Sequence, residues 1–444
     1  MSIRQTFMKY KQMRWYSTKQ KMKVIDTVND LLSNNELKHK CHPGKIKPKQ
    51  VEQPAWLKNT VLKILKDETI SPNVIKTHSK NLSLHLHKRH PPLEPMDMKL
   101  KFQEIRSRVQ IDDAENLSDE ELLQYPIVRK LFNSIVYHWT PILYDRYTSI
   151  AYLIGRSVPE YSVLYKIFKE IHDNDKSFMP KTLFDFGSGV GTVMWAASQL
   201  WHESIKEYYC VDVSGDANEL CENLIKYATP KININYVFHR QFMPASVFPT
   251  YDIVVSAYSL LELSNQKARI QTLLKLWQKT EKYLIIVEQG TRVGYKIIIE
   301  ARNFILNYGD KVKNAYVFSP CPHDLKCPRN MTDDTPCNFE ISYLTLPIGE
   351  ASSYKCERYS YVVLKKGDRP ENDVKWPRIV RPVLRRSKHV ICRMCTNSGN
   401  LEEQIFTTWK NGKNTYRCAR ESEWGDRLPF EYCETTEIEE PEEK

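Results

Sequence analysis

The chain of 444 residues carries 65 lysine or arginine and 54 aspartate or glutamate residues, which gives a formal net charge of +11. This length accommodates two or three domains. No apolar run approaches the roughly 20 residues that cross a bilayer, so we expect no membrane insertion. The positive excess fits a polyanionic partner, because each phosphate that a cation neutralises releases a counterion. It fits a solvated basic surface equally well.

Residues 1–23 form the first predicted segment, a mitochondrial targeting peptide. They contain seven lysine or arginine residues, several hydroxyl side chains and no acidic residue. This composition is typical of mitochondrial targeting rather than secretion, which requires a solid apolar centre. We therefore expect localisation in the mitochondrial matrix. The alternative is a basic arm that binds nucleic acid.

Two regions without a strand pattern follow. Residues 24–117 form a polar, basic N-terminal region in which the apolar spacing from Trp56 to Leu65 predicts one amphipathic helix. Residues 118–180 form a helical region, where Ser118 and Glu121 have the spacing of a capping box. This region also carries a helical packing face made of Tyr161, Leu164, Phe168 and Ile171.

From 181 to 310, short apolar segments alternate with helical patterns. The pattern predicts strands at 182–186, 208–213, 234–239, 252–257 and 283–288. It predicts helices at 192–200, at 266–278 and around 296–306, and one more after the second strand that includes Leu220 and Ile225. Strands that alternate with helices in this way indicate a parallel sheet covered on both faces.

A glycine-rich loop joins the first of these strands to the first helix. Gly187, Gly189 and Gly191 follow Asp185, and glycines let a ligand approach a backbone that leads into a helix N-terminus. Asp212 ends the next strand, where a carboxylate can accept hydrogen bonds from ribose hydroxyls. The pattern resembles class I S-adenosylmethionine-dependent methyltransferases. The alternatives are a dinucleotide-binding dehydrogenase, whose usual glycine spacing is absent, and a tight turn without a ligand.

The sequence offers no identifiable catalytic group. The segment after the fourth strand, 256–262, lacks the Asp/Asn-Pro-Pro-aromatic loop that holds a target amine in amino-methylating enzymes. Cytosine C5 methylation needs a thiolate near the cofactor, yet we expect Cys210 to be a core residue of its strand. The catalytic residues are therefore unknown, and the pocket acts either by positioning alone or without catalysis.

Residues 311–433 form a cysteine-rich region, and an acidic tail occupies 434–444. Eight of the 11 cysteines lie beyond residue 320, and no secretory signal suggests a disulfide framework. Thiolates are soft ligands that suit iron–sulfur clusters or zinc. Independent buried cysteines are the alternative. The candidate ligands are Cys321, Cys327 and Cys337, together with Cys392 and Cys395.

Several motifs resemble the methyltransferase-like protein 17 family, which assembles the mitochondrial small ribosomal subunit. They are 184–192, 287–295, 321–328, 376–384, 416–420 and 424–426, in the same order over roughly 120–430. The resemblance implies an α/β fold: a class I methyltransferase-like Rossmann sheet with an N-terminal helical region and a C-terminal cysteine-rich metal-binding region. Gln289 and Arg292 depart from the family, which tends to carry prolines at these positions.

The resemblance also implies cofactors and partners. It implies a [4Fe-4S] cluster on Cys321, Cys327, Cys337 and Cys395, with Cys392 in reserve as the fourth ligand. It implies S-adenosylmethionine binding through Asp185, Gly187, Gly189, Gly191 and Asp212. The expected partners are the immature small subunit, its ribosomal RNA and other assembly factors, without robust catalysis.

A basic run beside the later cysteines fits RNA, since arginines pair with phosphates and an aromatic ring stacks on a base. Two other functions compete with the assembly factor. One is an active S-adenosylmethionine-dependent ribosomal RNA methyltransferase, and the other is a zinc-dependent RNA-binding protein. The basic run comprises Lys375, Arg378, Arg381, Arg385, Arg386, Lys388 and Arg393, with Trp376 and Pro377 among them.

Overall fold

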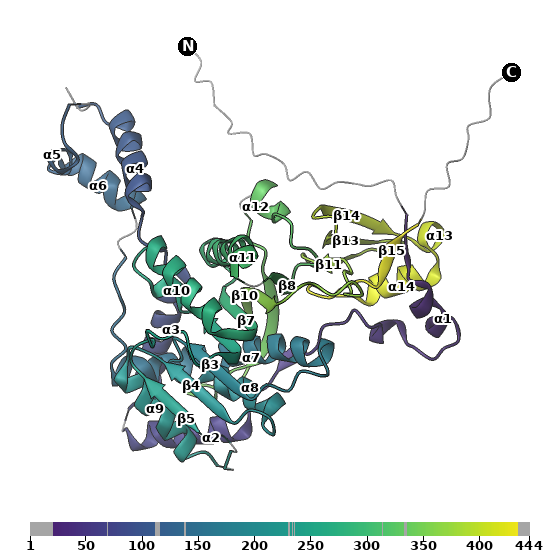
Figure 1. The fold of residues 1–444 in the computed structure, drawn as a ribbon. Coiled ribbons are helices and arrows are strands. Elements are labelled where there is room, and N and C mark those ends of the chain that lie inside the picture. Colours follow the sequence, from purple (N-terminus) through teal and green to yellow (C-terminus); the bar gives the residue numbers. More distant parts are fainter. Residues whose placement is uncertain are drawn as a thin grey trace.

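A computed structural model describes residues 21–433 apart from 69, 112–115, 137–138, 230, 233, 235, 313 and 333–334. Most of the predicted targeting peptide and the acidic tail lie outside the described residues. The centre of the molecule is a nine-stranded sheet of order β2-β9-β10-β7-β6-β3-β4-β5, with β8 also paired to β10 (Figure 1). In the part of the chain that is described, no helix is both long and apolar enough to span a membrane.

The parallel half of this sheet confirms the predicted alternation. Its strands are β3 (Thr182–Phe186), β4 (Glu207–Val211), β5 (Val237–Arg240), β6 (Tyr251–Ala257) and β7 (Thr280–Gln289). The intervening helices are α8 (Thr192–Trp201), α9 (Gly215–Lys226) and α10 (Gln266–Lys279), and α11 (Arg292–Val312) follows β7. Each crossover between neighbouring parallel strands requires such a long connection.

Helices cover both faces of the parallel strands, so each strand is apolar along its whole length. In β6, Ile253 and Val255 face a core shared with α8, whereas Val254 faces a second core shared with α10 and α11. All three side chains are fully buried. This explains the continuous apolar runs in the sequence.

The far half of the sheet completes the fold. β10 (Tyr354–Lys366) runs antiparallel to β7 on one side and to β8 (Ala315–Ser319) on the other. An antiparallel strand inserted between two parallel ones in this order is the class I methyltransferase arrangement, which confirms the predicted fold class. β9 (Phe339–Leu344) and β2 (Gln50–Val51) widen the sheet beyond it.

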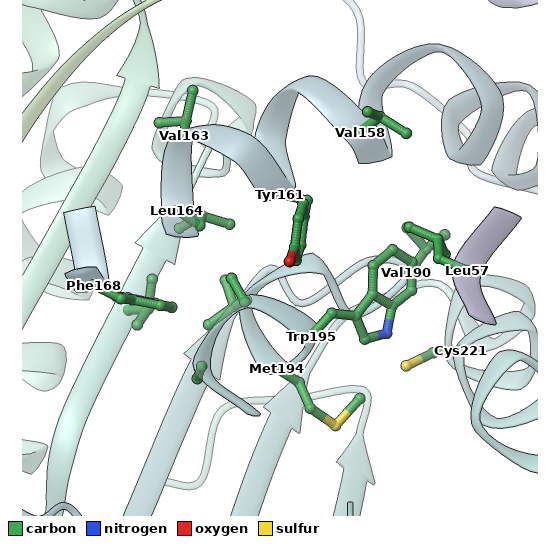
Figure 2. Packing of buried hydrophobic residues seen from close by; sticks show 14 of the residues in the cluster. Leu57, Val158, Tyr161, Val163, Leu164, Phe168, Val190, Met194, Trp195 and Cys221 are labelled. Atoms are coloured by element: carbon green, nitrogen blue, oxygen red, sulfur yellow. The ribbon is translucent and has the colours of Figure 1, made fainter. Parts of the chain in front are cut away.

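The N-terminal helices supply a large share of the core. α2 (Ala55–Asp67) confirms the predicted amphipathic helix, and α3 (Pro72–Lys88) packs on α7 (Arg146–Asn174). Figure 2 shows Leu57 of α2 beside Trp195 of α8, with Tyr161 and Leu164 of α7 over the same core. The rings of Trp56 and Trp195 meet edge to face, with centroids 5.6 Å apart. The polar N-terminal region is therefore part of the methyltransferase-like body.

Three further helices form a small cluster away from the body (Figure 1). They are α4 (Pro95–Arg108), α5 (Asp119–Leu122) and α6 (Pro126–Ile135), packed around Phe102, Ile105, Leu122 and Val128. The predicted capping box is present, since the Ser118 hydroxyl accepts from the Glu121 N–H and the Glu121 carboxylate accepts from the Ser118 N–H.

The C-terminal unit comprises residues 378–432 together with 22–42 from the other end of the chain. Its sheet contains β11 (Arg378–Ile379), β12 (Leu384–Arg385), β13 (Val390–Cys395) and β14 (Leu401–Phe406). Beside it lie α1 (Asp26–Ser33), the short helix η1 (His39–Cys41), α13 (Thr408–Asn411) and α14 (Lys413–Glu421). β1 (Met22–Val24) pairs with β15 (Phe430–Tyr432), so both ends of the described chain build one core.

A buried ion pair connects this unit to the methyltransferase-like body. The Arg378 guanidinium of β11 donates to both Glu170 carboxylate oxygens of α7, at 2.5 and 3.2 Å. Ser319 and Tyr361 also donate to this carboxylate, each at 2.9 Å. Arg378 is only 3% exposed, so the prediction that it belongs to an RNA-facing run is wrong. Its positive charge instead compensates the buried Glu170 carboxylate.

We expect Glu170→Gln to lower the free energy of unfolding by about 3–5 kcal/mol, because it leaves a buried guanidinium uncompensated. Burial raises the pKa of Glu170, but attraction to Arg378 more than offsets it and holds the pKa at about 2. The stabilisation is therefore complete above the unfolded pKa of about 4.3 and is lost as pH falls towards 2. Urea unfolding across this pH range measures both effects.

The matched control is Asp173→Asn on the same helix, which breaks a partly exposed pair with Lys169. Such pairs contribute at most about 1 kcal/mol. Equal destabilisation by the two substitutions would contradict the role of the Glu170–Arg378 pair.

Candidate functional site

A cavity of about 330 Å³ opens at the carboxyl ends of β3, β4 and β6. β3 lies between β4 and β6 in the sheet, so the chain leaves β3 at the point where the strand order reverses. Ligands of open α/β sheets bind at such switch points. The cavity volume falls at the lower end of the range for small-molecule sites.

The glycine loop forms one wall of this cavity. Gly187 and Gly189 line it, with φ angles of +74° and +48°, in the left-handed region that favours glycine. A Cβ on Gly187 would stand 2.4 Å from the Cβ of Ser259, whereas a Cβ on Gly189 would meet nothing within 4 Å. Gly189 therefore leaves open space where the backbone faces the cavity. Gly191 does not line the cavity and instead packs against Cys221.

Asp212 also lines the cavity and is held by the loop. Its carboxylate accepts from the N–H groups of Gly189 at 2.8 Å and Ser214 at 2.9 Å. Each oxygen retains a lone pair for a ligand hydroxyl. Burial raises the pKa of Asp212, although these two hydrogen bonds oppose the shift.

Asp185 occupies a different place from the one its sequence position suggested. It is fully buried in β3 and does not line the cavity. Neither carboxylate oxygen has a hydrogen-bond partner among the described residues. Burial, and then the nearby Asp212 charge, raise the pKa of Asp185 well above its usual range. A protonated side chain beneath the loop is consistent with this environment.

Three tyrosines that no sequence motif indicates form the inner wall of the cavity. Tyr144 and Tyr152 precede the sheet domain in the chain, and Tyr258 follows β6 with φ +57°. The Tyr258 ring packs against the Arg156 guanidinium, which lies 5.6 Å from the ring centroid. No local pattern distinguishes these tyrosines, because long-range packing brings them to the cavity.

A buried charged network supports this wall from behind. Arg156 donates to Glu357 at 2.9 Å and to Glu160 at 3.1 Å, and the Tyr152 hydroxyl donates to Glu160 at 2.8 Å. Burial raises the pKa of Glu160 to about 7, although Arg156 opposes the shift. Behind Tyr152 and Tyr258 this packing leaves only a small space of about 20 Å³, which Glu160 and Glu288 also line.

The two cysteines of the sheet domain are core residues. Cys210 and Cys221 are both fully buried, and burial raises the pKa of each thiol. Cys221 lies near Trp195 in the packed core (Figure 2). The expectation that Cys210 is a core residue is confirmed.

Four of the later cysteines line one small space between the two sheets. Cys321 follows β8, Cys327 precedes α12 (Pro328–Thr332), Cys337 precedes β9, and Cys395 ends β13. These are the four residues chosen from the sequence as ligands. The space measures only about 20 Å³, and in the described ranges no three His, Cys, Asp or Glu side chains are arranged to hold a metal ion.

Polar side chains lie close to the sulfurs of this group. The Tyr295 hydroxyl is 3.3 Å from the Cys327 Sγ, and the His323 Nε2 is 3.3 Å from the Cys395 Sγ. Burial raises the pKa of Cys321, while the Arg302 guanidinium opposes this shift. Four cationic groups thus stand around the four thiols, namely Arg302, Arg329, Arg378 and Arg381.

Cys392 faces the other way. Side chains alternate along a strand, so residues three apart on β13 point to opposite faces. Cys392 is fully buried in the core of the C-terminal unit with Phe406 and Cys418. Burial raises its pKa to about 12. The fold therefore groups Cys395, and not Cys392, with the three earlier cysteines.

Residues 146–429 match the model of a family described as mitochondrial small ribosomal subunit Rsm22. The chain belongs to this family. A human relative, the mitochondrial ribosome assembly protein METTL17, is 34% identical over 397 residues, which cover 88% of this chain and 86% of that protein. The resemblance found in the sequence is thereby confirmed. The mitochondrial proteins of this family also agree with the predicted matrix localisation.

Fungal relatives of this Rsm22-family chain are more distant. The Saccharomyces cerevisiae ribosome assembly protein RSM22 is 24% identical over 310 residues, 46% of this chain and 48% of that protein. The Schizosaccharomyces pombe Rsm22-cox11 tandem protein 2 is 29% identical over 327 residues, 63% of this chain and 43% of that protein. This chain therefore matches less than half the length of each fungal relative.

A solved magnesium protoporphyrin IX methyltransferase from Synechocystis, with bound S-adenosylmethionine, is similar at a TM-score of 0.31 and 12% identity. That similarity covers 54% of this Rsm22-family chain and 96% of the other. The strand order of the sheet, with β10 antiparallel between β7 and β8, identifies the fold.

Proposed function

We propose that this chain is an assembly factor of the mitochondrial small ribosomal subunit, which binds ribosomal RNA and enters the matrix with its targeting peptide. The observation that carries this proposal is the 34% identity to a ribosome assembly protein over 86% of that protein's length. The net charge of +11 supports an RNA partner. Other assembly factors complete the proposed set of partners.

We propose further that Cys321, Cys327, Cys337 and Cys395 hold a [4Fe-4S] cluster. The convergence of four thiols from distant parts of the chain supports this, since independent core cysteines have no reason to meet. Four thiolates and a cluster are anionic, and the neighbouring Arg302 and Arg329 offset part of that charge, whereas Arg378 is already paired with Glu170. Donors near thiolate sulfurs, such as Tyr295 and His323, are typical supports of such clusters.

Zinc is the competing metal. A structural zinc ion requires thiolates about 2.3 Å from one point, and in the described residues no three His, Cys, Asp or Glu side chains are arranged to hold a metal ion of any kind. A cubane of four irons and four sulfides is larger than one ion and accepts more widely spaced thiolates. The space of about 20 Å³ is smaller than such a cubane, so we expect loading to move the segments that carry the thiols.

We expect Cys395→Ser to abolish retention of the cluster, whereas the matched control Cys392→Ser retains it. Both thiols are buried and belong to one strand, so the two substitutions differ mainly in which face they alter. Iron and acid-labile sulfide are measured after anaerobic purification. Zinc without sulfide in the wild-type chain would contradict the cluster, and loss of sulfide in Cys392→Ser alone would reverse the choice of ligand.

The methyltransferase-like cavity is proposed to bind S-adenosylmethionine as part of a scaffold without robust methyl transfer. Gly187, Gly189 and Asp212 present the loop and carboxylate that the methionine and ribose groups of this cofactor would require. The buried network around Arg156 supports the lack of transfer, because it leaves only about 20 Å³ behind Tyr152 and Tyr258, too little for an acceptor base on that side.

Asp212→Asn tests whether assembly requires the cofactor cavity. This substitution weakens the proposed ribose contact but keeps the size of the side chain. We expect cells deprived of their own family member to assemble small subunits with this variant as with the wild-type chain, measured by gradient sedimentation. Cys395→Ser is expected to fail. Transfer of a labelled methyl group to ribosomal RNA by the purified wild-type protein, lost in Asp212→Asn, would establish the active methyltransferase instead.

A further inference from the structure

A basic hollow of about 530 Å³ lies on the C-terminal unit, where η1, the turn between β12 and β13, and α14 meet. These elements come from residues 38–40, 387 and 416–421, so the fold creates a surface that no single sequence segment contains. The side chains that line it are Lys38, His39, Lys40, Ser387, Tyr416, Arg417, Arg420 and Glu421.

Local packing determines which side chains face this hollow. Thr415, Cys418 and Ala419 are buried, so α14 turns Arg417 outward. The side chain of Asn414 on α14 bonds the His39 ring at 3.0 Å and thereby fixes η1 against the helix. The Arg420 guanidinium donates to the Arg386 carbonyl oxygen at 2.8 Å and to the Tyr416 hydroxyl at 3.2 Å. The hollow is therefore a defined surface.

Three cations in the hollow have no acidic partner in the described part of the chain. Lys38, Lys40 and Arg417 are exposed and form no ion pair there. Glu421 is the one acidic residue of the lining. Lys413 and Lys388 add charge nearby, on the exposed first residue of α14 and in the turn before β13. Like charges held together without partners favour an anionic ligand.

An exposed tryptophan stands at the start of the same helix pair. Trp409 of α13 is 96% exposed, more than any other large apolar side chain that the structure describes. α13 leads into α14 through Gly412, whose φ of +82° lets the two short helices join at an angle. An exposed aromatic ring of this size provides a stacking surface for a nucleobase, and the chain carries it four residues before Lys413, the first residue of α14.

We propose that this surface binds single-stranded RNA, with phosphates in the hollow and an unstacked base on Trp409. The inference rests on the proposed ribosomal function and assigns the RNA contact to residues outside the methyltransferase-like body. Charge complementarity favours a polyanion, and the exposed ring favours one with free bases. A base-paired helix satisfies the charges but offers no unstacked base to the tryptophan.

The test measures binding of the purified full chain to oligouridine over a range of salt concentrations. K40E/R417E reverses two unpaired charges, and W409A removes the ring. The control K267E/K275E makes the same change of charge on exposed lysines of α10 in the body. Circular dichroism and thermal unfolding verify that each variant is folded. Heparin serves as a polyanion without bases, a duplex RNA as a paired ligand, and polyglutamate as an acidic polypeptide.

We expect K40E/R417E to weaken oligouridine binding at least about tenfold and to reduce the slope of log affinity against log salt by about 1.4, at roughly 0.7 per phosphate contact. W409A is expected to weaken oligouridine binding about tenfold, with an unchanged slope and unchanged heparin binding. The control leaves oligouridine binding as in the wild-type chain.

Three results would overturn the assignment. They are equal effects of K40E/R417E and the control, equal loss of heparin and oligouridine binding in W409A, or binding of duplex RNA or polyglutamate as tight as that of oligouridine. Sedimentation of the variants with small subunits separates the two proposals. If K40E/R417E binds oligouridine normally while the wild-type chain still sediments with the subunit, the hollow is not the RNA-binding surface. The proposed ribosomal function is then retained.

Discussion

The buried pair between Glu170 and Arg378 is the interaction on which the rest of the structure depends. It joins α7, at the centre of the methyltransferase-like body, to β11 of the C-terminal unit. Arg378 also lines the space where the four cysteines meet. Burying both charges costs several kcal/mol per ion. The hydrogen bonds that Ser319 and Tyr361 donate to the Glu170 carboxylate help to offset this cost. The geometry of the cysteine site follows from this connection.

The two candidate sites differ in how far the sequence reveals them. The glycine loop is local: strand, turn and helix follow one another, and the prediction of β3 matches its observed bounds of Thr182–Phe186. The same local pattern predicts Asp185 at the ligand, although its side chain is fully buried and does not line the cavity. A strand residue faces one side or the other, and the packing on each side decides which.

The cysteine site depends on contacts across the chain. The sequence indicated a group of soft ligands, but the choice between Cys392 and Cys395 required the orientation of β13, which its pairing with β11 and β14 sets. The basic run was misjudged at Arg378 for a related reason, because composition does not distinguish an exposed arginine from one paired with a distant buried carboxylate. The tyrosine wall and the core role of α2 likewise arise from long-range packing.

A division of labour within the molecule follows from these features. The parallel sheet provides a rigid frame with a cavity whose inner side is closed, and the C-terminal unit presents exposed cations and an exposed tryptophan. The cysteine site lies between them. A cluster held by all four thiols would cross-link β13 to the segments that follow β8 and precede β9, so its presence would set the position of the C-terminal unit on the frame.

Hydrogen–deuterium exchange tests this account most directly, by comparing iron-loaded protein with protein stripped by a chelator under anaerobic conditions. The account predicts that loading slows exchange in β13 and in residues 320–338 and leaves β3, β4 and β6 unchanged. Unchanged exchange in β13 on loading, or slowing confined to the parallel strands, would contradict the claim that a cluster joins the C-terminal unit to the methyltransferase-like frame.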